Sequence, residues 1–406
     1  MLRNSLVAKL IPSSTNSRKR RIFCSSRRQS RPRPAKGLGM EALEDRVVLS
    51  AMTVINLNDS GPGSLRAAIN AANASVGVPD VIEFAPDVTG SINLTSGEFD
   101  VTDDLTINGP GKGKLTVSGS GQSRVFDVTD TSLAINQMTI ADGFTTQDLT
   151  DAAQHGTAGG AGIRATGSTV DLKQVVLEDH RVVDSVFAAG AALQIRSGSS
   201  ASLDHVSVRN NEASGLFFTT GGAIQSDSGS TLNIEHSEFV GNRAENDPTS
   251  TFTVSGGAIG ISGGGNTTIA HSQFRGNQVD GDNARGAGGA ISNSSGSSLD
   301  VDNTRFIGNS ALGSVAYGGA IANWFGSSST ISNSQFVGNS AVADSDAQGG
   351  AIFNGFGSPA FPASTTISNS SIVNNQAIGG GAVGGGISTV FGGNTTLTGT
   401  NVNANR

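Results

Sequence analysis

The sequence contains few residues of several types, and these scarcities narrow the possible folds. It has one cysteine, one tryptophan, one tyrosine and 10 prolines in 406 residues. A single cysteine excludes both a disulfide framework and a zinc site built on paired cysteines. Charged residues make up 15% of the chain, well below the usual share of about 25%. No apolar run approaches the roughly 18 residues that a transmembrane helix needs, so no transmembrane segment is predicted.

Glycine, by contrast, is abundant, with 56 residues. Glycine and proline together make up only about 16% of the chain, which is below the share typical of disordered low-complexity sequences. The strict Gly-X-Y period of collagen is also missing. The composition therefore favours a folded, glycine-rich chain with many turns.

Charge is distributed unevenly. Residues 1–46 hold 12 of the 26 Lys and Arg residues and three acidic ones, whereas the remaining 360 residues carry 14 basic and 30 acidic residues. We interpret 1–51 as a disordered basic leader or export segment. The acidic body argues against a nucleic-acid partner, because phosphate binding needs clustered Lys and Arg.

Two sequence landmarks recur about every 31 residues from residue 160 onward. The first is Gly-Gly-Ala-Ile, at 221–224, 256–259, 288–291, 318–321 and 349–352, with degenerate copies at 160–163, 190–193 and 384–387. The second is Phe-x-x-Asn, in which an aliphatic residue sometimes replaces Phe. Eight copies in register predict a repeat architecture.

Apolar residues alternate within each copy, as in Leu232-Asn233-Ile234. This period of two predicts strands, about three per copy, and excludes helical repeats. The copies are too short for propeller blades. Each copy can bury its apolar side chains only against its neighbours, so the sequence predicts a parallel β-helix with one repeat per coil. We place this domain at 105–406, with the repeated coils starting near 160.

A short amphipathic helix is predicted just before the β-helix. Ser64 is a suitable N-cap, and the apolar residues that follow share one helix face: Leu65, Ala68, Ile69 and Ala72. We expect this helix to cover the first coil within an N-terminal cap at 52–104.

The repeated residues have structural interpretations. Glycine permits a corner with positive φ, Ala fits a crowded inward position, and Ile fills the core. The Phe rings are predicted to stack in the core: Phe239, Phe274, Phe306 and Phe336. The Asn residues are predicted to occupy left-handed turns and to form a hydrogen-bonded ladder: Asn211, Asn242, Asn277, Asn309, Asn339, Asn375 and Asn405.

Another column lies three residues before each Phe position: Gln137, Gln174, His205, His236, His271, Asn303, Asn333 and Asn369. Three consecutive histidines stacked about 5 Å apart are a possible metal site. Because Asn fills the same column in later coils, and both residue types favour left-handed turns, we predict no metal and no cofactor. The alternative is a metal site at His205, His236 and His271.

The same fold occurs in pectate lyases and polygalacturonases, so catalysis has to be argued from site motifs and not from the fold. The Gly-His-Gly and Arg-Ile-Lys strings of polygalacturonases are absent. Residues 203–207, Leu-Asp-His-Val-Ser, resemble a pectate-lyase motif but lack its aromatic residue. We therefore predict no catalytic residue. The alternative is a polysaccharide lyase or glycoside hydrolase that acts on an acidic polysaccharide through Asp204 and His205.

Three segments resemble known families. The Gly-Gly-Ala-Ile and Phe-x-x-Asn repeats over about 160–405 resemble those of the chlamydial polymorphic membrane proteins. Residues 63–69, Gly-Ser-Leu-Arg-Ala-Ala-Ile, are similar to the CSLREA segment of bacterial right-handed β-helix proteins. Residues 43–51, Leu-Glu-Asp-Arg-Val-Val-Leu-Ser-Ala, resemble the planctomycete LEPR-xLL export motif, with Asp45 in place of Pro. These resemblances imply an all-β, right-handed parallel β-helix of the pectate-lyase-like type, located outside the cell or on its surface.

The function predicted from these observations is that of a secreted or cell-surface scaffold, similar to an adhesin or passenger domain. Its partners would be a cell-surface polysaccharide or a protein, bound through variable loops at 212–220, 243–254, 279–287, 310–317, 340–348 and 355–363. Trp324, Phe325 and Phe356 would either form an exposed cluster there or pack onto the rod. An open coil end would also allow end-to-end self-association.

Overall fold

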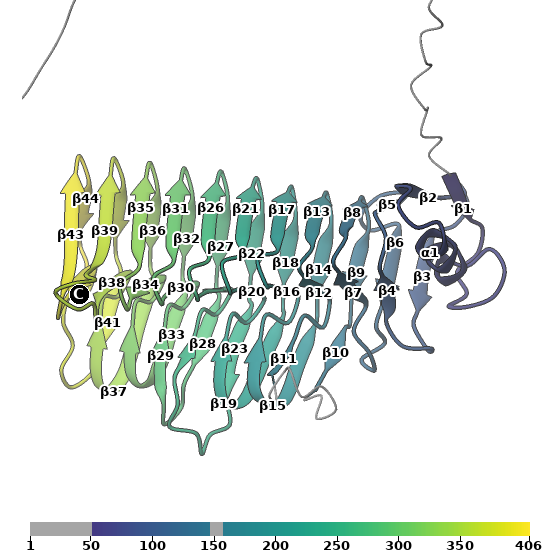
Figure 1. The fold of residues 1–406 in the computed structure, drawn as a ribbon. Helices are drawn as coiled ribbons and strands as arrows, with labels where there is room; N and C mark the ends of the chain where they lie inside the picture. Colours follow the sequence, from purple (N-terminus) through teal and green to yellow (C-terminus); the bar gives the residue numbers. More distant parts are fainter. Residues whose placement is uncertain (1–50, 147–156) are drawn as a thin grey trace, which may run out of the picture. The chain divides into compact units, whose positions relative to one another are not determined.

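Every coil of the chain places its strands beside the equivalent strands of the next coil, in parallel (Figure 1). The computed structural model describes residues 51–146 and 157–406. All of these residues belong to one compact unit. The predicted leader and its export-like run therefore lie outside the described residues, apart from Ala51.

Three parallel sheets, A to C, run the length of the solenoid, and a fourth, sheet D, begins at Phe144. Sheet A consists of β1 (Ala51–Val54), β2 (Asp80–Phe84), β5 (Leu105–Asn108), β8 (Ser132–Asn136), β13 (Thr169–Lys173), β17 (Ser200–Asp204), β21 (Thr231–Glu235), β26 (Asn266–Ala270), β31 (Ser298–Asp302), β35 (Ser328–Ser332), β39 (Ala363–Ser368) and β43 (Gly393–Thr398). Sheet B consists of β3 (Gly90–Asn93), β6 (Leu115–Ser118), β9 (Thr139–Ala141), β14 (Val176–Glu178), β18 (Ser207–Arg209), β22 (Glu238–Val240), β27 (Gln273–Arg275), β32 (Arg305–Ile307), β36 (Gln335–Val337), β40 (Ser371–Val373) and β44 (Asn401–Asn403).

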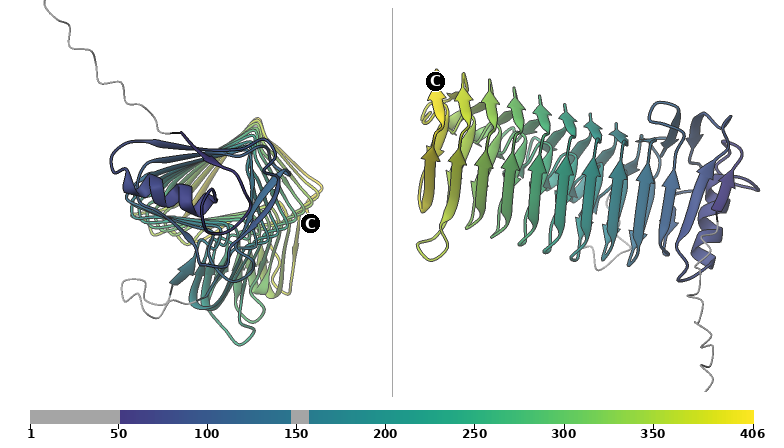
Figure 2. Two further views of the ribbon diagram at one scale, coloured as in Figure 1. Left: turned by 90° about the vertical axis from the view of Figure 1, so that its right-hand side faces the viewer. Right: turned by 90° about the horizontal axis from the view of Figure 1, so that it is seen from above.

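Sheet C closes the core opposite these two, and sheet D projects away from it (Figure 2). Sheet C consists of β4 (Phe99–Val101), β7 (Phe126–Thr129), β12 (Ile163–Thr166), β16 (Leu193–Arg196), β20 (Ile224–Ser226), β25 (Ile259–Ile261), β30 (Ile291–Asn293), β34 (Ile321–Trp324), β38 (Ile352–Gly355) and β42 (Ile387–Thr389). Sheet D consists of β10 (Phe144–Thr145), β11 (Thr157–Gly159), β15 (Arg181–Ala189), β19 (Glu212–Thr220), β23 (Arg243–Asn246), β24 (Val254–Ser255), β28 (Gln278–Asp280), β29 (Arg285–Ala287), β33 (Ser310–Tyr317), β37 (Ser340–Gln348) and β41 (Gln376–Ile378).

Sheet D differs from the prediction, which gave three strands per coil and six variable loops, five of them following a ladder Asn. Most of the residues assigned to those loops form strands, such as β19, β33 and β37. The chain leaves the core along one arm and returns along another, since β28 and β29 both pair with β33. Alanines on both arms form a small core of their own. Alanine is a weak strand former, so local sequence gave little indication of these strands.

The first two residues of each Gly-Gly-Ala-Ile copy make a tight corner between sheets D and C. Gly288 has φ +69°, a left-handed conformation that favours glycine. A Cβ on Gly289 would collide with the carbonyl oxygen of Gly319 in the next coil. Ala290 and Ile291 that follow are completely buried. Close coil-to-coil approach therefore explains the glycine pair.

Identical residues stack along the interior of the solenoid. The rings of Phe239, Phe274, Phe306 and Phe336 are fully buried, with successive centroids 4.5, 5.0 and 4.7 Å apart and nearly parallel planes. A second polar column, which the sequence analysis missed, lies on sheet C. There Asn293 donates to Asn323 at 2.8 Å, and Asn323 donates to Asn354 at 2.9 Å.

The asparagines of the Phe-x-x-Asn repeat form a ladder from Asn211 to Asn405. At each step the Oδ1 of one Asn accepts hydrogen bonds from the Nδ2 and the backbone N–H of the Asn one coil earlier, as Asn309 does from Asn277 at 2.9 and 3.0 Å. The expectation that these Asn residues themselves adopt left-handed turns is wrong. The residue just before each one does so, with φ between 53° and 65°, because the corner must be made before the amide can point inward.

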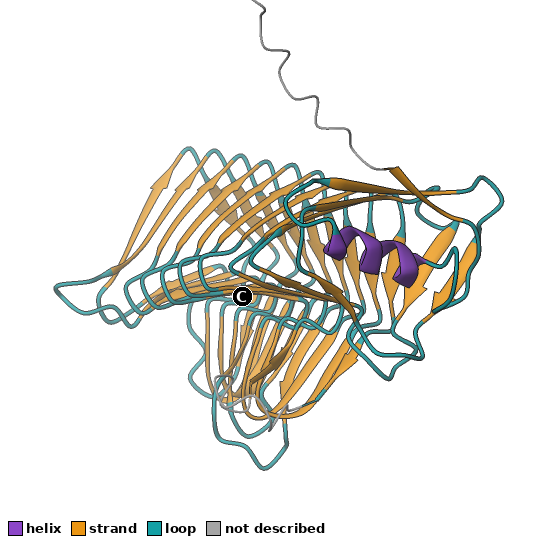
Figure 3. Ribbon diagram, turned by 45° about the vertical axis from the view of Figure 1, so that its right-hand side comes forward, coloured by secondary structure: helices purple, strands orange, loops and turns teal. Residues whose placement is uncertain are grey.

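The predicted helix is present as α1 (Leu65–Ala74), which lies at the N-terminal end of the solenoid (Figure 3). Ser64 caps it by accepting a hydrogen bond from the Ala67 N–H, and Leu65, Ile69 and Ala72 are buried in the main core. The boundary predicted at 104/105 is not marked by a change of sheet, because β1 to β4 already belong to sheets A, B and C. Within the described residues, α1 is the one helix, and it is too short to cross a membrane.

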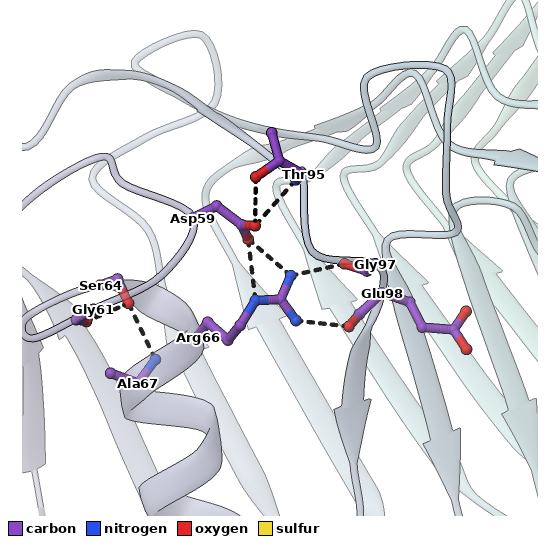
Figure 4. Close-up of polar contacts among 8 residues, drawn as sticks. All are labelled: Asp59, Gly61, Ser64, Arg66, Ala67, Thr95, Gly97 and Glu98. Carbon is purple, nitrogen blue, oxygen red and sulfur yellow. Dashed lines mark hydrogen bonds and ion pairs between the residues drawn. The ribbon is translucent and has the colours of Figure 1, made fainter.

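Arg66 ties α1 to the loop before β4 (Figure 4). Its guanidinium donates to Asp59, at 2.8 Å, and to the carbonyls of Gly97 and Glu98. Asp59 also accepts hydrogen bonds from Thr95. Burial by itself raises the pKa of Asp59, but these hydrogen bonds outweigh it and lower the pKa to about 2.

His180 takes the place of an asparagine at the N-terminal end of the ladder. Its Nδ1 accepts a hydrogen bond from the Gly143 N–H at 2.9 Å, and its own N–H donates to the Oδ1 of Asn211 at 3.1 Å. Burial of the ring lowers the pKa of His180 to about 3, although the carbonyl of Ile140 raises it in part. The imidazole is therefore neutral at physiological pH.

We expect Phe306→Ala to lower the free energy of unfolding by about 3–5 kcal/mol, because it leaves a cavity between two stacked rings. Thermal or urea unfolding measures the change. The matched control is Phe361→Ala, since Phe361 is 74% exposed and should change stability little. Equal effects of the two substitutions would contradict the buried stack.

His180 should make the protein less stable as the pH falls from about 6.5 toward 3. Over that range the unfolded chain binds a proton that the folded chain does not, so this group removes about 1.4 kcal/mol of stability per pH unit. His180→Asn keeps a ladder acceptor but removes the titration. The stability of the two proteins, measured by urea unfolding, should diverge below pH 6, and parallel pH profiles would refute the assignment.

Candidate functional site

Two columns of mostly polar side chains point outward from sheet A. Apolar residues such as Leu203 and Val301 face the core, and the alternate residues face outward. The register of the strands aligns the outward residues from coil to coil. One column is Ser202, Asn233, Thr268, Asp300 and Thr330, and the other is Asp204, Glu235, Ala270, Asp302 and Ser332.

These columns line a groove of about 670 Å³ that crosses β17, β21, β26, β31 and β35. Its residues are short, and most carry a hydroxyl, amide or carboxylate group. Within the groove, the Thr268 hydroxyl donates to the Asn233 Oδ1 at 2.6 Å. Surfaces of this kind, with hydrogen-bonding groups at regular spacing, suit an extended polar ligand.

The groove is acidic. Four of its lining residues are carboxylates, and none is Lys or Arg. Lys173 lies beside it, with Nζ 3.7 Å from the Asp204 Oδ2. The Ser332 hydroxyl and the Asn333 amide donate to Asp302 and lower the pKa of that carboxyl. An anionic ligand would therefore need a bridging cation.

Asp204 and His205, the residues of the catalytic alternative, lie together at one end of the groove. The His205 Nδ1 is 2.5 Å from the Asp204 Oδ1, and the His236 Nδ1 of the next coil is 3.7 Å from the same oxygen. Burial raises the pKa of Asp204, but the hydrogen bond from His205 and the charges nearby, including that of Lys173, lower it overall. The carboxylate is therefore ionised.

His205, His236 and His271, the residues of the metal alternative, form one stacked column. Successive ring centroids are 4.8 and 5.1 Å apart. All eight residues of the column have φ between 45° and 58°, in the turn between sheets A and B. His205 and His236 share the Asp204 carboxylate, whereas His271 does not join that cluster.

The sequence analysis missed Glu235, Asp300 and Asp302 as members of the groove. The period of two that identified the strands also determines which residues point outward. The sequence therefore contained the information needed to place these three carboxylates on the outer face of sheet A. The analysis also missed His180 as a ladder residue, although it lies 31 residues before Asn211.

The aromatic residues near the C-terminal coils pack mainly onto the solenoid. Trp324 and Tyr317 are buried, and the Tyr317 ring lies 4.5 Å from that of Phe353. Phe325 is 49% exposed beside them. Of the two alternatives from the sequence, packing on the rod therefore holds for Trp324, whereas Phe325 is exposed.

A second group of carboxylates lies near the N-terminal end and is neutralised by arginine. Glu98 pairs with Arg124 at 2.5 Å, and Asp127 pairs with Arg164 at 2.6 Å. Asp100 is the third member of this group. Because arginines satisfy two of the three acids, the group resembles a structural ion-pair network.

Comparisons with known proteins give structural matches with TM-scores below 0.5. No protein-family model matches the sequence, and no curated protein matches it. Among solved structures, a variant of the PL6 family alginate lyase AlyGC is 14% identical, with 86% of this chain and 53% of the lyase covered and a TM-score of 0.36. This chain thus spans about half the length of that enzyme.

Two further solved structures give similar values. A mannuronic acid specific polysaccharide family 6 lyase from human gut microbiota is 10% identical, with 86% of this chain and 83% of the lyase covered and a TM-score of 0.35. The catalytic unit of a GH87 α-1,3-glucanase from Streptomyces thermodiastaticus is 13% identical, with 85% of this chain and 68% of the glucanase covered and a TM-score of 0.29. The strand pairing of the chain itself shows a parallel β-solenoid.

Proposed function

We propose that the protein binds a polysaccharide chain along the groove of sheet A and cleaves it as a lyase or hydrolase. The observation that carries this proposal is the groove itself. Five adjacent strands extend about 19 Å at the usual strand spacing, which accommodates several units of an extended polymer. Sugar hydroxyls would hydrogen-bond to the outward carboxylate, amide and hydroxyl groups of the two columns.

The negative charge of the groove favours some classes of polysaccharide ligand over others. A neutral chain can enter directly, and carboxylate acceptors suit its hydroxyl donors. An acidic chain, which was the alternative from the sequence, meets four carboxylates and no lining Lys or Arg. We therefore propose that an acidic chain binds only when a divalent cation is present to bridge carboxylates of ligand and protein.

Cleavage is assigned to the Asp204 end of the groove. There a carboxylate contacts an imidazole at 2.5 Å, and Glu235 is its register partner in the next coil. Lyases and hydrolases both require positioned groups of these types at the reacting bond. Asp204 is the residue on which we expect turnover to depend.

A non-catalytic surface scaffold is the second candidate. It is favoured by the repeated residues, which serve the interior: the Phe stack, the Asn ladder and the glycine corners. Both candidates share the groove as a binding surface. We propose an extracellular or cell-surface location for either, since most polysaccharide partners are found there.

The purified full chain should bind at least one glycan in a panel of neutral glucans and polyuronates, assayed with calcium and with chelator. Asp300→Ala should weaken binding about tenfold, because it removes a charged acceptor from the middle of the groove. Asp171→Ala is the matched control, since Asp171 occupies the same outward column on β13 but does not line the groove.

New reducing ends or unsaturated products would show cleavage, and Asp204→Asn should abolish them. Binding without products would support the scaffold candidate. A chain that binds no glycan, or one in which the Asp300 and Asp171 variants lose binding equally, would refute the groove as the site.

A further inference from the structure

We propose that Asp204, His205 and His236 form a binding site for one divalent transition-metal ion, of which Zn²⁺ is the probe. One ligand atom from each residue lies within 4.8 Å of the others. The Asp204 Oδ1 is 2.5 Å from the Nδ1 of His205 and 3.7 Å from the Nδ1 of His236. Two imidazoles and one carboxylate form a common metal-ligand set, and a metal ion bound by these three groups keeps further coordination positions open.

Only small side-chain movements are needed to close this set around an ion. Two nitrogens bound to one Zn²⁺ at about 2.0–2.1 Å lie about 3.4 Å apart in tetrahedral geometry. The candidate ligand atoms of Asp204, His205 and His236 lie within 4.8 Å of one another, and the two imidazole side chains are 53% and 46% exposed. Exposed rings can rotate about their χ angles to reach the separation required by the ion without disturbing the core.

The backbone that carries the ligands is fixed. His205 donates its backbone N–H to the Glu235 carbonyl, and His236 donates to the Ala270 carbonyl, both at 3.2 Å. Both residues occupy the same left-handed turn position in consecutive coils. A rigid frame that presents ligands from adjacent coils lowers the entropic cost of assembling a metal site.

The donor set selects among ions. Two imidazoles favour Zn²⁺, Cu²⁺ or Ni²⁺, whereas Ca²⁺ takes six to eight oxygen ligands. Lys173 lies 3.7 Å from the Asp204 Oδ2, which leaves Oδ1 as the ligand atom. Asp204 also lines the groove, so the open positions of the ion would face a ligand lying there.

His271 lies outside this site, although its ring stacks on His236 at 5.1 Å. The carboxylate close to His271 is that of Asp302, and it accepts hydrogen bonds from Ser332 and Asn333. Asn303 occupies the same column position one coil later, so a His-to-Asn change in this column is compatible with the backbone. His271→Asn is therefore a matched control for His236→Asn.

The experiment is a Zn²⁺ titration by isothermal calorimetry of the full chain, free of any histidine tag and without polysaccharide. We expect one equivalent to bind, with at least tenfold weaker binding in both Asp204→Asn and His236→Asn. His271→Asn should bind Zn²⁺ as the unaltered protein does. Mg²⁺ and Ca²⁺ should not compete at equal concentration. Thermal melting of each variant shows that the fold is retained.

Two outcomes would overturn the proposal. The first is the absence of Zn²⁺ binding by the unaltered chain. The second is equal loss in the His271 and His236 variants, which would place the ion elsewhere in the histidine column. Because the titration contains no polysaccharide, its failure is distinguishable from failure of the proposed function. Its success would assign Asp204 a second role as a metal ligand.

Discussion

The hydrogen bond between stacked asparagines is the interaction on which the arrangement of the coils depends. At each step one side-chain oxygen accepts both an amide and a backbone N–H from the previous coil, and the side-chain amide donates to a carbonyl nearby, as Asn277 does to Phe239. The chain turns away from the core at this point, and its polar groups would otherwise be buried without partners. The ladder therefore fixes where sheet D leaves the core in the coils from β15 to β41.

Repetition made the fold predictable from sequence. The spacing of Gly-Gly-Ala-Ile predicted the register of sheet C, where Ile291 pairs with Ile259 and Ile321. Alternation predicted sheets A and B. Sheet D was not predicted, because its strands rely on alanines that pack between two arms, such as Ala311 and Ala316. Their burial depends on the return of the chain, which local patterns do not indicate.

The site was predictable only in part. The sequence identified Asp204 and His205 by motif, and the histidine column by period. It did not indicate that Asp204 lies within reach of two histidines, since that depends on side-chain direction at a left-handed turn. The other groove carboxylates were inconspicuous because acidic residues are common on exposed strand faces. What distinguishes Asp300 and Asp302 is their alignment with neighbouring coils.

The ladder also has a consequence for how the protein unfolds. In the described part of the chain it extends from Asn405 back to His180, and the coil before presents Gly143, which has no side chain to continue it. On the N-terminal side of this point, side-chain contacts of other kinds join adjacent coils: Glu98 pairs with Arg124, and the Asn136 amide donates to Asn108. The stability of a solenoid is approximately a sum of the interfaces between neighbouring coils. The coils that share the ladder should therefore unfold as a more uniform cooperative unit than the N-terminal coils, whose contacts differ from coil to coil.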